Sequence, residues 1–338
     1  MASLLAARLV CRAPIVQSAV LRQLPKFPKQ SLVRYYASES RDAAARAARR
    51  QTIKEKMMAP AGETAFNIGQ GAVAGGALLG LGALCYYGLG MSKDVGLMEQ
   101  SVIWPQYVRD RIKTTYMYFG SSIAITAASA MAAFRSPAIM NLVTKNGWMG
   151  IMITLGAMMG TGMLCQGIEY QEGVGPKQLA WLVHAGTMGA VLAPLCFLGG
   201  PLLMRAAWLT AGVVGGLSTV AVCAPSEKFL NMGAPLAMGF GVVFAASIGS
   251  AFLPPTTALG AGLYSMSIYG GLLLFSAFLL YDTQRIIKQA ENYPASPKLY
   301  GVRNYDPINA AISIYLDTLN IFIRIATILA SGGGGQRR

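Results

Sequence analysis

Long stretches without a charged residue alternate with short polar segments along this chain. Asp, Glu, Lys and Arg are absent from residues 64–92, 115–134, 146–168, 178–204, 206–226 and 229–281. About 20 apolar residues are enough to cross a bilayer as a helix. In the longest stretch Pro235 favours a helix start, and Pro254–Pro255 ends that helix because proline disrupts the preceding turn. The pattern predicts eight spans, near 66–90, 116–134, 148–165, 178–198, 205–223, 234–252, 258–282 and 307–330.

The composition agrees with an all-α polytopic membrane protein. Of the 338 residues, 54% are hydrophobic and only 12% are charged. That balance is unusual for a soluble domain. Five cysteines without a C-x-x-C pair argue against a disulfide framework or a zinc site. The sequence shows no nucleophile with a matching base, so we expect neither an enzyme nor a bound cofactor.

The first 36 residues have the composition of a mitochondrial transit peptide. They contain no acid and six basic residues, which are Arg8, Arg12, Arg22, Lys26, Lys29 and Arg34. A secretory signal would instead contain one unbroken apolar stretch of about 7–15 residues. Arg34 stands three residues before a potential matrix-processing cut between Tyr36 and Ala37. We therefore predict mitochondrial import of a chain cleaved after residue 36, with a basic cytosolic tail as the alternative.

Much of the basic charge lies at this end of the chain. Residues 1–60 carry twelve Lys or Arg and three acids, so they supply +9 of the formal net charge of +14. Because no aromatic residues interleave with a basic surface, we expect no nucleic-acid partner. Residues 37–65 form a polar segment that we expect on the matrix side, where its arginines can touch anionic lipid.

The first predicted span, residues 66–90, is rich in glycine. It contains two G-x-x-x-G pairs, Gly71 with Gly75 and Gly76 with Gly80. Small residues four apart let another helix approach closely within a membrane. The sequence leaves open whether that helix belongs to this chain or to a separate inner-membrane partner.

The last predicted span carries polar residues along one face. Their spacing of three or four residues is that of a helix face, and they are Asp306, Asn309, Ser313, Asp317, Asn320, Arg324, Thr327 and Ser331. This polar stripe is either a seam of interhelical hydrogen bonds or the lining of a cavity open to water and ions. A seam would not require a carboxylate about 10 residues, or about 15 Å, inside the segment.

Two acids lie in the last two apolar segments. Asp317 is deep in its segment, whereas Asp282 ends the segment 258–282 and has Arg285 three residues later, which is also the pattern of an interfacial ion pair. If the two acids approach each other, both cannot remain charged at low cost, so they would share a proton. Deprotonated, they would offer the hard oxygen ligands that Ca²⁺ prefers. The hypothesis that follows is a pH-controlled cation site.

The strings FLLYDTQ and IYLDTLN around these acids resemble signatures of the transmembrane Bax-inhibitor-motif family. Residues 107–330 fit the seven-helix core of that family, which leaves 66–90 as an extra helix and 331–338 as a polar tail. The strings CYYGLG, IWPQYVRDRI and CAPSEKFLNMGAP are similar to those of one mitochondrial member of the family.

The resemblance implies a pH-sensitive route for Ca²⁺, as a leak or as Ca²⁺/H⁺ exchange, through an aspartate pair that matches Asp282 and Asp317. It also implies an arginine on an early helix that latches the pair. The matching string here, MLCQGIEY, contains no arginine. Arg285 and Arg324 are the candidate replacements.

Two functions of different classes follow from these observations. The first is a channel or antiporter of the mitochondrial inner membrane that moves Ca²⁺ with protons, contributing to calcium homeostasis, cristae organisation and the restraint of apoptosis. The second is a scaffold without transport, which binds inner-membrane protease or respiratory components through its first helix and residues 37–65. In either case, eight spans with a matrix amino terminus return the carboxyl terminus to the matrix.

Overall fold

A computed structural model describes residues 53–60, 62–88, 104–144, 148–225, 228–294 and 304–332. The transit peptide, its cleavage site at Arg34, Tyr36 and Ala37, and most of the polar segment 37–65 lie outside these residues. The chain divides into two compact units at residue 59. In the first unit the structure describes one short helix, α3 (Ile53–Met58). Everything that follows concerns the second unit.

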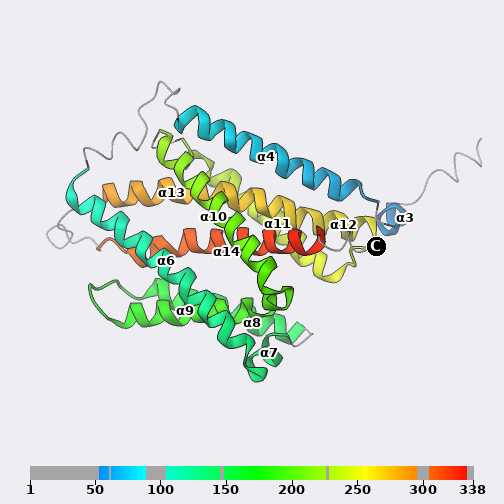
Figure 1. Cartoon of the computed structure of the whole chain (residues 1–338), viewed down its shortest axis with the longest axis horizontal. Coiled ribbons are helices and arrows are strands. Elements are labelled where there is room, and N and C mark those ends of the chain that lie inside the picture. Colours follow the sequence, from blue (N-terminus) through cyan, green and yellow to red (C-terminus); the bar gives the residue numbers. More distant parts are fainter. Residues whose placement is uncertain are drawn as a thin grey trace, which may run out of the picture. The chain divides into compact units, whose positions relative to one another are not determined.

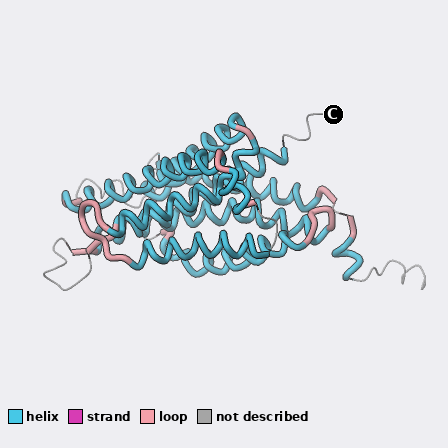
Figure 2. The backbone as a smooth tube through the Cα atoms, turned by 90° about the horizontal axis from the view of Figure 1, so that it is seen from below, coloured by secondary structure: helices cyan, strands magenta, loops and turns pink. Residues whose placement is uncertain are grey.

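The second unit is built from helices. In chain order these are α4 (Thr64–Gly88), α6 (Gln106–Phe134), α7 (Pro137–Val143), α8 (Trp148–Gly167), α9 (Pro176–Leu192), the 3₁₀-helix η1 (Ala193–Leu198), α10 (Gly200–Cys223), η2 (Leu230–Met232), α11 (Gly233–Phe252), α12 (Ala258–Ser265), the π-helical turn η3 (Met266–Gly270), α13 (Gly271–Asn292) and α14 (Pro307–Gly332). Figure 2 draws the described residues as helices and loops, and within the described ranges no strand is present.

The all-α membrane fold predicted from the sequence is confirmed. Six helices of the described residues are long and apolar enough to cross a membrane, and they are Gln106–Phe134, Pro176–Leu198, Gly200–Cys223, Leu230–Phe252, Ala258–Asn292 and Pro307–Ser331. The other two predicted spans are also helical, as α4 and α8, but they are not among these six. The count of eight crossings therefore stays a prediction.

Two helices extend well past their predicted bounds. The apolar pattern predicted spans 116–134 and 258–282, whereas α6 begins at Gln106 and α13 continues to Asn292. The apolar pattern predicts only the part of a helix that lies within the bilayer. The helix itself continues into the flanking polar residues for as long as its backbone hydrogen bonds are made. The predicted break at Pro254–Pro255 is present, and Thr257 restarts the helix there by accepting a hydrogen bond from the Gly260 amide at 3.1 Å.

The helix α14 lies at the centre of the bundle. It contacts α13, α6 and α10, and Figure 1 shows it running alongside α13 while α6 and α10 cross the pair obliquely. Half of the residues in its apolar stretch are buried, against 17–39% in the other five candidate spans. Its apolar side chains, such as Ile314 and Ile321, pack with Leu279 and Ile286 of α13 in the main core. Within the polar stripe of the last span, Asp317 and Arg324 are buried, the other stripe residues from Asp306 to Thr327 are half-buried, and Ser331 is exposed.

The helix α4 packs on this same chain, through a face that only partly matches the predicted glycine pairs. It contacts α10, α12 and η3. A Cβ on Gly76 would collide with Leu273 of α13, whereas Gly71, Gly75 and Gly80 have no atom of another described element within 4 Å of that position. Gly69, which the glycine pattern did not single out, lies against Tyr269 and Ser265. The shapes of η3 and α13 decide which glycines are used, and those shapes are not visible in the sequence of α4.

Replacing Gly69 by Ala is expected to destabilise the protein by about 1–3 kcal/mol, because the added methyl group overpacks the contact with Tyr269. Gly71→Ala is the matched control, since the new methyl group meets open space. Thermal unfolding of both variants in detergent checks this. Equal midpoints for the two variants would contradict the packing of α4 described above.

Candidate functional site

The packing of α13 against α14 brings Asp282 and Asp317 together. The two helices are neighbours in the bundle, and each acid lies on the side that faces the other helix. Asp282 is 6% exposed and Asp317 is 5% exposed. Their side chains are within hydrogen-bonding contact of each other. The two acids predicted from the sequence as a site are thus one buried pair.

The surroundings of the aspartate pair suit a shared proton. Asp317 Oδ2 is buried and accepts no hydrogen bond from any donor in the described part of the chain. Two ionised carboxylates are acceptors only, so a hydrogen bond between them requires a proton on one. Asp282 also lies within hydrogen-bonding contact of Ser313. The Ser313 hydroxyl donates to the Ala310 carbonyl at 3.0 Å, so its oxygen remains available to the site.

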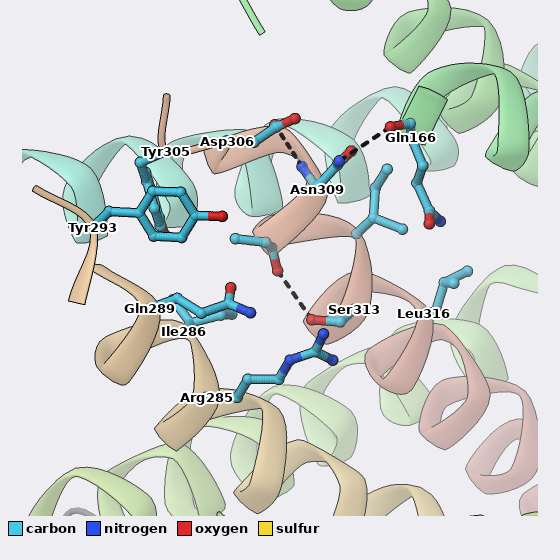
Figure 3. A pocket seen from close by; sticks show the side chains of 12 residues that line it. Gln166, Arg285, Ile286, Gln289, Tyr293, Tyr305, Asp306, Asn309, Ser313 and Leu316 are labelled. Atoms are coloured by element: carbon cyan, nitrogen blue, oxygen red, sulfur yellow. Dashed lines mark hydrogen bonds between the residues drawn. The ribbon is translucent and has the colours of Figure 1, made fainter. Parts of the chain in front are cut away.

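Arg285 is the cation nearest to the pair. Its Nη1 lies 3.6 Å from Asp282 Oδ1, which is an ion pair but too long for a hydrogen bond. The side chain is 50% exposed. Figure 3 shows it reaching from α13 toward Ser313 on α14. Of the two candidate replacements for the missing latch arginine, Arg285 lies at the pair.

A pocket of about 400 Å³ borders Arg285 and Ser313, and neither aspartate of the pair lines it. Its wall is formed by the end of α8, the end of α13 and the start of α14, and its polar residues include Gln166, Arg285, Gln289, Tyr305, Asn309 and Ser313. Arg285 and Ser313 line this pocket and also contact Asp282. The pair therefore lies one layer of side chains behind a polar, accessible cavity.

A buried ion pair fixes the rim of the pocket. Lys177 of α9 is 0% exposed and forms an ion pair with Asp306. Its Nζ also donates to the Ile168 carbonyl at 2.7 Å and to Asn309 Oδ1 at 2.9 Å, so all three ammonium protons have acceptors. Asp306 in turn caps α14 by accepting from the amides of Ile308 and Asn309. One cluster thus joins α8 and α9 to the start of α14.

A second cation fixes the C-terminal end of α13, beside the same pocket. Arg111 of α6 donates to the carbonyls of Ala290, Tyr293 and Pro294 at 3.0, 2.7 and 2.8 Å. These groups include the unpaired carbonyls at the helix end, where a positive charge is favourable. Nearby, burial raises the pKa of Tyr305 to about 12, although its hydrogen bond with Thr115 acts in the opposite direction. Tyr305 is therefore an uncharged hydrogen-bonding group at physiological pH.

The far half of the polar stripe is a different environment. Asn320 Nδ2 donates to the Leu316 carbonyl at 2.9 Å. Arg324 donates to Asn320 and to the Ser267 carbonyl. In the described structure Arg324 forms no ion pair with either aspartate. The part of the stripe before Asp317 lines a pocket, and the part after Asp317 is a hydrogen-bonded seam. The two predicted alternatives, a cavity lining and a seam, therefore each describe part of the stripe.

Sequence reasoning missed Lys177 and Arg111. Each lies near an end of an apolar segment, where a basic residue is usually solvated or near lipid headgroups. Lys177 directly follows the proline that starts α9, whereas Arg111 lies six residues after Pro105, in the second turn of α6. His184, which was not predicted as a site residue, is buried in the core with Nδ1 3.0 Å from the Thr161 hydroxyl.

Helical spans around a buried acid pair define a multi-pass membrane protein with an ionisable site at membrane depth. Residues 108–334 match the family described as inhibitor of apoptosis-promoting Bax1. The chain belongs to this family, as the strings around Asp282 and Asp317 predicted.

Similar proteins come from animals and bacteria. The growth hormone-inducible transmembrane protein of Rattus norvegicus is 55% identical over 99% of this chain and 100% of its own length. Bax inhibitor 1 of Drosophila melanogaster is 26% identical over 66% of this chain and 83% of its own length. An uncharacterized protein of Helicobacter pylori is 27% identical, with 68% and 90% covered. The bacterial match extends over most of that protein, so the shared part is the membrane core.

Replacing Lys177 by Met is expected to destabilise the protein by about 3–5 kcal/mol, because it leaves the Asp306 carboxylate without its buried counter-charge. The double variant Lys177→Met with Asp306→Asn should recover part of this loss. Lys113→Met on the exposed face of α6 is the control. Thermal unfolding in detergent of wild type, Lys177→Met, Asp306→Asn and the double variant measures the coupling, and additive effects of the two substitutions would refute the ion pair.

Proposed function

We propose that this protein is a proton-linked cation pathway of the mitochondrial inner membrane. Ca²⁺ is the proposed substrate, and Asp282 with Asp317 is the proposed site for the proton and the cation. The observation that carries the proposal is the buried pair lying directly behind a polar pocket of about 400 Å³. Ionisable residues at bilayer depth are costly, and a pair of them reached by a cavity has a physical use in ion passage.

Proton and cation would compete for the same oxygen atoms. With one proton shared, the pair has little affinity for a divalent cation. Without the shared proton, the two carboxylates and the Ser313 hydroxyl offer hard oxygen ligands. Water entering from the pocket completes the coordination shell of about 6–8 oxygen ligands that Ca²⁺ takes. Because binding requires deprotonated ligands, cation occupancy falls as pH falls.

Arg285 would control entry from the pocket. Its positive charge lies between the cavity and Asp282, so a cation approaching the pair is repelled until the side chain moves. Half of this side chain is exposed and its ion pair is long, which makes the movement inexpensive. In this arrangement Arg285 serves the role that the family resemblance assigns to an arginine on an early helix.

The location and the cellular role are part of the same proposal. The acid-free basic leader supports mitochondrial import, and the acid pair supports transport in preference to catalysis. The family description links related proteins to the inhibition of apoptosis. We infer that Ca²⁺ movement across the inner membrane would connect the site to calcium homeostasis, cristae organisation and the restraint of apoptosis.

The outer face of α4 favours a second candidate function. Ile68, Leu78 and Leu79 are 67–77% exposed, and Gly71 and Gly75 lie on open surface. Lipid or the helix of another inner-membrane protein would cover this face. A scaffold that binds protease or respiratory components would use it and would not need the aspartate pair.

Asp317→Asn is expected to lower Ca²⁺ flux at least about tenfold and to flatten its pH dependence, because one of two charges beside a divalent cation is lost. The measurement uses purified full-length protein in liposomes containing a Ca²⁺ dye, with steps of external pH. Wild-type flux should rise with pH, as the shared proton leaves.

The control is Asp110→Asn, which makes the same change at an exposed position of α6. It should leave both flux and pH response unchanged. Wild-type behaviour of Asp317→Asn would refute the transport proposal and favour the scaffold.

A further inference from the structure

Arg324 is a buried cation in the middle of α14. It is 9% exposed and lies seven residues beyond Asp317 on the same stripe, which is about 10 Å along the helix. Throughout the described ranges no carboxylate oxygen lies within 4 Å of its guanidinium. The ion pairs found there join Lys177 to Asp306 and Arg285 to Asp282. An arginine at membrane depth without a counter-ion is costly, so its retention needs a reason.

Neutral groups hold the guanidinium in one position. Its Nε donates to the Ser267 carbonyl at 3.1 Å. Its Nη1 donates to the carbonyl and the side-chain Oδ1 of Asn320 at 3.0 and 2.8 Å. The ring of Phe275 lies 4.6 Å from the guanidinium carbon. These contacts fix the cation and supply acceptors for Nε and Nη1, but none of them cancels its charge.

The π-helical turn η3, directly before α13, accommodates the side chain of Arg324. In an α-helix the Gly271 amide would bond to the Ser267 carbonyl, but in the π-helical turn it bonds to Met266 and Ile268. The Ser267 carbonyl is thereby left for Arg324. Gly271 also provides the space, because a Cβ there would collide with Arg324 Nε and lie 2.8 Å from its Cζ. Two irregular features of one helix thus serve a single arginine.

The charges on the two sides of the aspartate pair differ. On the pocket side, the cations Arg285 and Lys177 each have an acid partner. On the far side, Arg324 keeps an uncompensated positive charge in a setting of low dielectric. A cation that left the pair along the stripe would meet this charge after about 10 Å, and a divalent cation is repelled twice as strongly as a monovalent one.

We propose that Arg324 is a fixed electrostatic barrier on the stripe beyond the aspartate pair, which slows every cation that passes along the stripe and slows divalent cations most. The proposal extends the proposed cation pathway and rests on it for the passage of cations along the stripe. It makes Arg324 a specificity-determining residue. A purely structural role, in which Arg324 only ties α14 to the break before α13, predicts different behaviour of the variants below.

The test compares variants that separate charge from hydrogen bonding. Liposomes with reconstituted full-length protein report Ca²⁺ leak at mildly alkaline pH, where the aspartate pair has lost the shared proton and the charge of Arg324 limits passage. Arg324→Gln removes the charge and should raise the leak about tenfold. Arg324→Lys keeps the charge but loses the planar fork, and its leak should stay within about twofold of wild type.

Asn320→Asp is a second test, which can be used if Arg324→Gln does not fold. It keeps the guanidinium of Arg324 and the Oδ1 atom that accepts its hydrogen bond, and it turns the side-chain amide into a carboxylate 2.8 Å from Nη1. The barrier should then be neutralised and the leak should rise, whereas a structural tie would be strengthened and the leak should stay low. Asn141→Asp, which makes the same change at an exposed position of α7, is the control and should leave the leak unchanged.

The outcomes also separate this barrier from the proposed pathway. A leak in Arg324→Gln and Asn320→Asp, with a tight Arg324→Lys, supports the barrier even if wild type shows no proton-linked flux, which would refute the pathway alone. Equal leaks in Arg324→Gln and Arg324→Lys with a tight Asn320→Asp would overturn the barrier. Proton-linked flux in wild type with no leak in any variant would also overturn it and leave the pathway standing.

Discussion

The contact between α13 and α14 places two carboxyl groups side by side where water is scarce. Several polar and charged groups of the structure are positioned around this pair. In such a setting each unpaired polar group is expensive, so the groups nearby are arranged around it. Ser313 and Arg285 contact Asp282. Further out, Arg111 caps the end of α13, and Lys177 holds the capping acid of α14. The ends of both helices are thereby fixed.

The same helix pair separates two environments along one stripe. Toward the start of α14 the polar side chains border a pocket, and the cations there are paired with acids. Past Asp317 the stripe closes into hydrogen bonds around Arg324, whose charge has no acid partner among the described residues. This distribution of charge would produce a pathway with one readily accessible side and one side where cations are repelled, and it makes the irregular turn η3 part of the site.

Particular residues show how far the sequence led. Asp317 was identifiable because polar residues three and four apart mark one face of a helix, and a carboxylate deep in such a face is rare. Asp282 had an equally good interpretation as an interfacial acid, and the family resemblance paired it with Asp317. Lys177 looked like an ordinary residue at a helix start, although the structure buries it completely. Its side-chain partners Asp306 and Asn309 are 129 and 132 residues away, and such separations leave no periodic signal.

What the chain determines locally is the set of apolar segments, the breaks at proline and the polar face of the last helix, because these depend on hydrophobicity and backbone chemistry within one segment. Which faces meet depends on the shapes of several helices at once. Gly76 rather than Gly75 therefore packs against the bundle, and Arg285 rather than Arg324 lies at the aspartate pair. The pairing of the two acids, the pocket in front of them and the setting of Arg324 arise only when distant segments pack together.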